Sequence, residues 1–169
     1  MTTLKPGDDF PENVKFAYIP YLPENESVTA CGVPQDYDAS KEFKQKKVVL
    51  VSVPGAFTPT CQNEHVTGYI RHLPKLKEKG VDQVVVVAYN DAYVMAAWGK
   101  ANGVKGDDII FVSDDGTPFS SSLGWTMGAR TARYAIVVDH GKVVYAEKEP
   151  AKGLTVSSAE TVLSVLSKL

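Results

Sequence analysis

The stretch VVLVSVPGAFTPTC, residues 48–61, decides how this chain folds. Residues 48–53 form a run of mostly β-branched apolar side chains, which is typical of a strand buried on both faces. A Pro-Gly pair and a second proline then interrupt regular structure. Thr58 can serve as the N-cap of a helix and Pro59 as its first residue, because the missing N–H of proline costs nothing there. The stretch therefore predicts a strand, a tight turn and the start of a helix.

Cys61 falls in the first turn of this predicted helix. Unpaired backbone N–H groups and the positive end of the helix dipole lie there, and both favour the thiolate form of a cysteine. The turn also follows the carboxyl end of a strand, where open α/β sheets carry their active sites. We therefore expect Cys61 to be a reactive cysteine that the fold exposes, and not an inert buried side chain.

The composition predicts one globular domain over residues 1–169. Of the 169 residues, 44% are hydrophobic and 22% are charged, and the formal net charge is −2. Such a charge gives no general attraction to nucleic acid or an anionic membrane, and no apolar run approaches the roughly 20 residues that span a bilayer. The first nine residues lack the apolar core of a signal peptide, so we expect an intracellular protein with reduced thiols.

Further elements follow the first strand and helix. Gly68 and Pro74 predict that the helix after Cys61 is kinked or divided into two. Apolar runs at 84–88 and 109–112 predict two more buried strands, each followed by a helix. We place these helices at 92–98, capped by Asp91, and between Pro118 and Gly124.

The two ends of the chain predict antiparallel strands. Residues 14–19 alternate like a half-buried strand, with 27–31 as a weaker candidate partner. Strands at 133–139 and 142–146 flank the hairpin signal His140-Gly141. A closing helix follows a capping box that runs from Ser157 to Glu160. Together the elements predict an α/β fold with a central mixed β-sheet and helices on both faces.

Several kinds of cysteine chemistry compete for Cys61. A Cys-x-x-Cys disulfide oxidoreductase is excluded at this site, because Glu64 occupies the second cysteine position. A cysteine protease needs a partnered histidine, and His65, His72 and His140 show no recognised signature. A zinc site would combine Cys61 and His65 with Cys31 and His72, but no pair of short ligand motifs supports it. We expect His65 to be a packing or hydrogen-bonding residue beside the site.

The motif Pro54-x-x-x-Thr58-x-x-Cys61 resembles the active-site motif of the peroxiredoxins, which are thiol peroxidases with a thioredoxin-like fold. Residues 79–82, 90–98 and 133–138 extend the similarity to almost the whole chain. The chain is most similar to the peroxiredoxin 5 branch, with its fungal alkyl hydroperoxide reductases and peroxisomal, allergen-type members. This resemblance implies a thioredoxin-like fold with an extra N-terminal hairpin and a peroxidase without haem, metal or flavin.

The resemblance also implies roles for individual residues. Cys61 would attack the O–O bond of hydrogen peroxide or an alkyl hydroperoxide and become a sulfenic acid. Thr58 would bond the peroxide and the thiolate, and Pro54 would shape the pocket and shield the intermediate from water. The active-site arginine of the family corresponds best to Arg133, with Arg130 as the competing assignment. Its guanidinium would favour the thiolate and bind the peroxide oxygens.

Judged from the residues alone, an inert and a reactive Cys31 are equally consistent with the sequence. The segment 29–35 resembles the part of fungal alkyl hydroperoxide reductases that carries their resolving cysteine. Mammalian peroxiredoxin 5 has this cysteine near its C-terminus, but no cysteine follows Cys61 here. We therefore expect Cys31 to attack the Cys61 sulfenic acid across a homodimer, and thioredoxin to reduce the disulfide. The alternatives are a one-cysteine cycle with glutathione or another thiol, and a redox sensor or chaperone-like protein with little turnover.

Two further predictions concern location and substrate. Ser167-Lys168-Leu169 matches the S-K-L address that the peroxisomal import receptor reads, so we expect a peroxisomal protein, with the cytosol as a further location. The width of the peroxide pocket depends on the packing of four large side chains. These could also belong to a dimer interface or to the core, and they are Phe57, Trp98, Trp125 and Met127.

Overall fold

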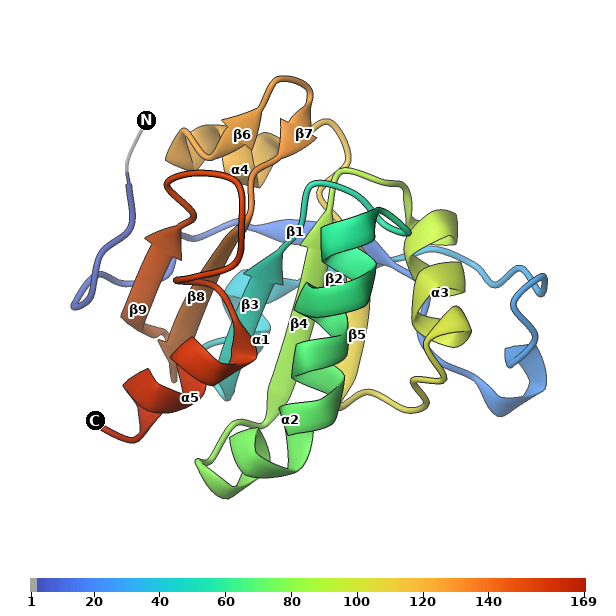
Figure 1. Cartoon of the computed structure of the whole chain (residues 1–169). Coiled ribbons are helices and arrows are strands. Elements are labelled where there is room, and N and C mark those ends of the chain that lie inside the picture. Colours follow the sequence, from blue (N-terminus) through green and yellow to red (C-terminus); the bar gives the residue numbers. More distant parts are fainter. Residues whose placement is uncertain (1–2) are drawn as a thin grey trace.

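A seven-stranded mixed sheet lies at the centre of the computed structural model, which describes residues 3–169 (Figure 1). Its spatial order is β2-β1-β5-β4-β3-β8-β9, and a separate two-stranded ribbon pairs β6 with β7. The strands are β1 (Lys15–Tyr18), β2 (Gln35–Asp38), β3 (Lys47–Ser52), β4 (Gln83–Ala88), β5 (Ile109–Ser113), β6 (Thr126–Met127), β7 (Arg130–Thr131), β8 (Tyr134–Asp139) and β9 (Lys142–Lys148). The helices are η1 (Pro23–Asn25), α1 (Ala39–Glu42), η2 (Cys61–Val66), α2 (Thr67–Glu78), α3 (Ala92–Ala101), α4 (Pro118–Leu123) and α5 (Ala159–Leu166).

The predicted mixed sheet is confirmed. β3, β4 and β5 are parallel, because a helix connects each strand to the next. β8 runs antiparallel to β3, and β9 runs antiparallel to β8. His140 and Gly141 join β8 to β9 with φ angles of 47° and 86°, the left-handed conformations that a two-residue hairpin turn requires.

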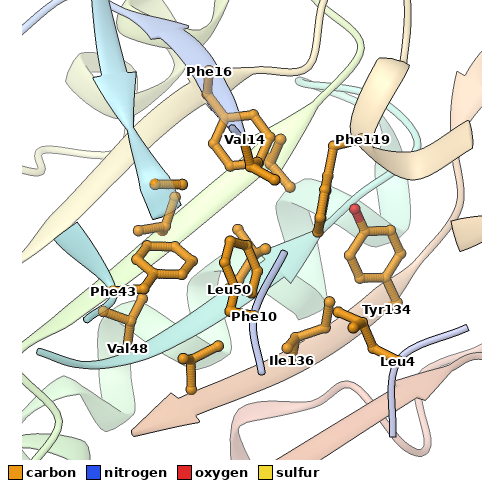
Figure 2. Packing of buried hydrophobic residues seen from close by; sticks show 14 of the residues in the cluster. Leu4, Phe10, Val14, Phe16, Phe43, Val48, Leu50, Phe119, Tyr134 and Ile136 are labelled. Atoms are coloured by element: carbon orange, nitrogen blue, oxygen red, sulfur yellow. The ribbon is translucent and has the colours of Figure 1, made fainter. Parts of the chain in front are cut away.

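Helices cover both faces of the sheet, as predicted (Figure 1). Along β3, Val49 and Val51 face a cluster that contains residues of α2, α3 and α5, while Val48 and Leu50 face the opposite cluster. The alternation follows from the two-residue period of a strand. On the second face, Figure 2 shows the rings of Phe10, Phe43 and Phe119 packed with Leu50 and Ile136.

The N-terminal hairpin has a different second strand from the predicted one. β1 pairs antiparallel with β2, and Phe16 lies opposite Tyr37. Residues 27–31 are not a strand: Ala30 N donates to Ser27 O at 3.0 Å in a tight turn, and Val28 is 47% exposed. The prediction was wrong because the segment has no large side chain that it buries, whereas Tyr37 is buried and packs edge-on against Tyr18.

Two local predictions about helices also needed correction. α2 continues through Gly68 and Pro74, and the irregularity lies earlier, in the π-helical segment η2. π-helical turns are rare and occur frequently at functional sites. The N-cap of α5 is Ser158, whose Oγ accepts from Thr161 N at 3.1 Å, and not Ser157. The Ser157 side chain has a different partner, since its Oγ donates to Glu149 Oε1 at 2.8 Å.

The other helix ends agree with the predictions. Asp91 caps α3 by accepting from Val94 N, and Gly124 ends α4 with a φ angle of 72°. Within residues 3–169, every helix is too short or too polar to cross a membrane.

Candidate active site

The topology of the sheet brings the end of β3, which leads to Cys61, close to the start of β8, which Arg133 precedes. Ser52 at the end of β3 lies opposite Tyr134 at the start of β8. Arg133, one residue before β8, therefore lies at the carboxyl end of β3. Ser52 Oγ donates to Ala132 O at 2.8 Å, and Thr131 Oγ1 donates to Val53 O at 2.7 Å. Both bonds are buried, so they hold the segment before Arg133 firmly against the end of β3.

The turn between β3 and η2 has a constrained backbone. Ala56 N donates to Asn90 Oδ1 at 2.9 Å, and Phe57 adopts a left-handed φ of 61°. A Cβ atom at Gly55 would lie 3.2 Å from Thr58 Cγ2, which is closer than side chains usually approach. The turn therefore leaves Phe57 54% exposed and directs Thr58 inward, against Gly55.

Thr58 directly precedes the helical residues Pro59 and Thr60, which lead into η2, so its position is as predicted, but its side chain does not cap the helix. Its carbonyl accepts from Gln62 N at 2.8 Å, while its hydroxyl donates to Gly55 O at 2.7 Å. A hydroxyl has one proton and two lone pairs. Because the hydroxyl proton is donated to Gly55 O, the Thr58 Oγ1 can only accept a further hydrogen bond. In this structure Thr58 therefore does not donate a hydrogen bond to a thiolate.

Cys61 is buried, with an exposed fraction of 1%, so the expectation that the fold exposes it was wrong. The position in the first helical turn was correct, but the side chain turns inward and belongs to the apolar cluster on the α2 face of the sheet. The first turn packs directly on the sheet, and this placement withdraws the sulfur from bulk water.

Arg133 is the arginine that contacts Cys61. Its Nη2 donates to Cys61 Sγ at 3.3 Å, and its Nη1 donates to His65 Nδ1 at 2.9 Å. The competing residue, Arg130, instead lies over the ring of Tyr89, 5.7 Å from its centre. A guanidinium so close to the sulfur stabilises negative charge there, and it adds to the effect of the helix N-terminus.

His65 orients this arginine. The side chain is completely buried, and this burial lowers its pKa from 6.5 to about 4, so the imidazole is neutral near pH 7. Its Nε2 lies 2.8 Å from Ser157 O, and a carbonyl oxygen only accepts hydrogen bonds. We therefore assign the proton to Nε2, which leaves Nδ1 as the acceptor for Arg133. The predicted hydrogen-bonding histidine is thus observed next to the cysteine.

Gln62 ties the first helical turn to α3. Its Oε1 accepts from Trp98 Nε1 at 2.5 Å and from Asn102 Nδ2 at 3.1 Å, while its Nε2 donates to Asn102 Oδ1 at 2.6 Å. Three bonds to one side chain hold the residue after Cys61 in place. The sequence contained no local signal for this network, because its members come from different elements.

Cys31 lies in an exposed loop between η1 and β2, as predicted. Its Sγ has only a weak contact, 3.9 Å from Thr29 O. Lys100 Nζ donates to Ala30 O at 2.8 Å and so connects this loop to α3. The structure does not place Cys31 in hydrogen-bond contact with Cys61.

The zinc alternative finds no support in the geometry. Among residues 3–169, no three His, Cys, Asp or Glu side chains are grouped to hold a metal ion. His65 bonds Arg133 and Ser157, and His72 bonds Glu160 at 3.0 Å.

The four large side chains named from the sequence divide into two groups. Trp98 and Trp125 are buried and belong to the core. Phe57 and Met127 are 54% and 55% exposed. Phe57 is part of the turn that carries Thr58, and its ring lies 6.3 Å from that of Trp98.

The fold and site together define a class of protein. It is the class of thioredoxin-like α/β proteins in which a strand leads into a helical turn that carries a cysteine. In this chain the cysteine lies beside an arginine that directly precedes a neighbouring strand. The Redoxin family model matches residues 5–163. The chain belongs to the Redoxin family and is a peroxidase of the peroxiredoxin type, as the motif at residues 54–61 predicted.

Individual relatives match over almost their whole length. Peroxiredoxin Pen c 3 of Penicillium citrinum is 58% identical over 97% of this chain and 99% of its own. A putative peroxisomal peroxiredoxin of Lipomyces kononenkoae is 47% identical over 94% of this chain and 99% of its own. The crystal structure of reduced Prx3 from Vibrio vulnificus in complex with H2O2 has a TM-score of 0.83 and 35% identity, and it covers 98% of this chain and 97% of its own.

Proposed function

We propose that the chain reduces hydrogen peroxide and alkyl hydroperoxides through the thiolate of Cys61. The observation that carries this proposal is the 3.3 Å contact between Arg133 Nη2 and Cys61 Sγ at a helix start. The thiolate attacks one peroxide oxygen and the O–O bond breaks. Sulfur becomes a sulfenic acid, and the other oxygen takes up a proton and leaves as water or an alcohol.

Three residues assist this step. Thr58 accepts the hydrogen bond of the peroxide O–H, since its own proton is held by Gly55 O. Arg133 stabilises the negative charge that develops on the peroxide oxygens as their bond breaks. Pro54, which is buried, shapes the pocket and keeps water from the sulfenic acid.

We further propose that Cys31 resolves the sulfenic acid. Its thiolate attacks the Cys61 sulfur, a disulfide forms and water leaves, and thioredoxin then reduces the disulfide. The exposed position of Cys31 supports this role, because an attacking thiol must be accessible. Cys61 is 1% exposed, so its helical turn has to open before the two sulfurs meet. We place the attacking Cys31 in the second subunit of a homodimer.

A one-cysteine cycle is the second candidate. It is favoured by the loose hold on Cys31, whose sulfur makes one weak hydrogen bond, to Thr29 O at 3.9 Å. In that cycle an external thiol such as glutathione attacks the Cys61 sulfenic acid. The rest of the site is the same in both candidates.

Steady-state peroxide consumption separates the candidates. Wild type, Cys31→Ser and Cys61→Ser are compared with thioredoxin and its reductase, and in parallel with glutathione. Turnover with thioredoxin that is lost in Cys31→Ser supports the two-cysteine cycle. Turnover with glutathione that survives this change supports the one-cysteine cycle, and stoichiometric oxidation without turnover indicates a redox sensor.

Non-reducing electrophoresis tests the position of the disulfide. After peroxide treatment, wild type should show a band at twice the monomer mass, and this band should vanish in Cys31→Ser. A band that persists in this variant would contradict the assignment of Cys31.

We also propose that the protein is imported into peroxisomes. Ser167, Lys168 and Leu169 follow α5 and are exposed, as a receptor-bound tripeptide has to be. One relative is named as a putative peroxisomal peroxiredoxin. Removal of the three residues should change punctate fluorescence of a tagged protein to a cytosolic distribution. Unchanged puncta would show that the tripeptide is not the address.

A further inference from the structure

The segment between β9 and α5, residues 149–158, is held together by one carboxylate. Glu149 Oε1 accepts from the backbone N–H groups of Thr155, Val156 and Ser157 at 2.8, 2.8 and 2.9 Å. It also accepts from Ser157 Oγ at 2.8 Å, and Glu149 Oε2 accepts from Thr155 Oγ1 at 2.7 Å. Burial raises the pKa of Glu149, but these hydrogen bonds outweigh it and leave the pKa below its ordinary value. The carboxylate is therefore ionised near pH 7.

This arrangement fixes the carbonyl group of Ser157. Ser157 is completely buried, and its oxygen accepts from His65 Nε2 at 2.8 Å and from Tyr69 OH at 2.7 Å. Because this carbonyl holds the proton of His65 on Nε2, the opposite nitrogen is free to accept from Arg133 Nη1. A displaced Ser157 would leave both the ring orientation and the tautomer of His65 undetermined.

Glu149 also meets Arg133 directly, through the backbone. Glu149 N donates to Arg133 O at 2.9 Å, immediately beyond the paired residues of β8 and β9. The same residue thus holds the main chain of Arg133 and, through Ser157 and His65, the guanidinium. Only the second of these connections depends on the Glu149 side chain.

We propose that Glu149 is a positioning residue for peroxide reduction, which acts through Ser157 and His65 to aim Arg133 at the Cys61 sulfur. The proposal rests on the role given to Arg133 above. An arginine that is fixed before the peroxide arrives stabilises the developing charge without first being reoriented.

The test measures the second-order rate constant for oxidation of Cys61 by hydrogen peroxide. Glu149→Ala should lower it about tenfold, the usual effect of losing one well-placed hydrogen bond in the transition state. Glu149→Gln should stay within about twofold, because its amide oxygen still accepts from the three N–H groups and its NH2 group donates to Thr155 Oγ1. Glu147→Ala removes an exposed charge two residues earlier, in β9, and as the control it should not change the rate constant.

A double-mutant cycle shows whether the effect passes through Arg133. In an Arg133→Ala background, Glu149→Ala should lower the rate constant less than about twofold, because the guanidinium is no longer there to be aimed. A tenfold loss in both backgrounds, or no loss in either, would overturn the proposal. If Arg133→Ala itself has the wild-type rate constant, the role of Arg133 fails together with this inference. A slow Arg133→Ala with a normal Glu149→Ala refutes the inference alone.

Nitrogen NMR of the histidines gives an independent readout. His65 should show a protonated Nε2 and a bare Nδ1 in wild type and Glu149→Gln, and a mixture of tautomers in Glu149→Ala. If Glu149→Ala does not fold, Glu149→Asp replaces it, because its shorter carboxylate keeps the charge but does not reach all three N–H groups. An unchanged His65 spectrum in the variant would contradict the proposal.

Discussion

The two cysteines of this chain differ in almost every physical respect. Cys61 is 1% exposed, lies in a helical turn and accepts a hydrogen bond from Arg133. Cys31 is exposed, lies in an irregular loop, and its sulfur makes one weak hydrogen bond. The comparison shows that the surroundings of a thiol set its chemistry. A helix N-terminus, a nearby cation and exclusion of water favour attack on a peroxide, whereas exposure to solvent favours attack on another sulfur.

The comparison also shows a conflict within the proposed cycle. The hydrogen bonds that stabilise the turn around Cys61 also keep the Cys61 sulfur from reaching a second thiol. Gln62 is bonded to Trp98 and Asn102, and His65 is bonded to Arg133 and Ser157. The loop around Cys31 has far fewer such bonds, although Lys100 attaches it to α3. The turn that carries Cys61 therefore has to be stable enough for peroxide attack and still open for disulfide formation.

Replacement of each cysteine by serine is the strongest test of the contrast between Cys61 and Cys31. Cys61→Ser should abolish peroxide reduction, because a serine hydroxyl is not ionised near pH 7 and does not form a sulfenic acid. Cys31→Ser should still consume one equivalent of peroxide per chain, measured by mass spectrometry of the oxidised protein. Rapid oxidation of Cys31 in the Cys61→Ser variant would reverse the assigned roles.

The two arginines provide the next test. Arg133→Ala should lower the rate constant for Cys61 oxidation by hydrogen peroxide by about 10²- to 10³-fold, the usual cost of one transition-state donor. Arg130→Ala should change it less than about threefold, because Arg130 lies over Tyr89 and not beside the sulfur. Stopped-flow measurement of tryptophan fluorescence provides both rate constants. Equal losses in the two variants would show that general positive charge matters and that the contact with Cys61 does not.

Acid should destabilise the fold because it favours protonation of His65, which lies next to Cys61. The pKa of His65 is about 4 in the folded protein and 6.5 in the unfolded chain, so the unfolded state binds more protons between these values. Stability is therefore fully present above pH 6.5 and is lost as the pH falls toward 4, by about 3 kcal/mol in total. Urea unfolding of wild type and His65→Gln at several pH values measures this slope, which should be shallower in the variant.

His140→Asn is the matched control for that experiment. His140 is exposed, with 63% of its side chain accessible, and asparagine tolerates its left-handed φ of 47°. This variant should keep the wild-type slope between pH 6.5 and 4. A slope that disappears with His140 and not with His65 would assign the acid sensitivity to the surface hairpin.

The smallest expected effect concerns the hydrogen bonds of Gln62. Gln62→Ala removes its contacts with Trp98 and Asn102, which should destabilise the fold by about 1–2 kcal/mol and ease the opening of the turn. Disulfide formation after oxidation should become faster, by about threefold or more, while the rate constant for peroxide attack changes little. Quenched-flow trapping of the sulfenic acid separates the two steps. Slower disulfide formation in Gln62→Ala would show that the ordered turn promotes resolution.

Much of the site was predictable because its signals are local. Residues 48–61 placed a strand, a turn and a helix start, and the structure has β3, the turn and a helical segment there. Asp91 as a cap and His140-Gly141 as a hairpin turn depend on neighbouring backbone groups, so short-range patterns sufficed. The errors arose where a local pattern competed with distant partners. Ser157 has the sequence of a cap, but its hydroxyl donates to Glu149, and Ser158 caps the helix instead.

The sequence by itself determined the strand-to-helix turn, the place of Cys61 in the first helical turn and the order of elements that produces a mixed sheet. Only the tertiary structure decided that the Cys61 sulfur is buried, that Arg133 and not Arg130 contacts it, and that His65 is neutral. It alone showed that Glu149 is joined to the site through Ser157. The physical reason is the range of the interactions: turns and caps depend on residues a few positions apart, whereas burial and charge contacts depend on which strands the completed sheet places side by side.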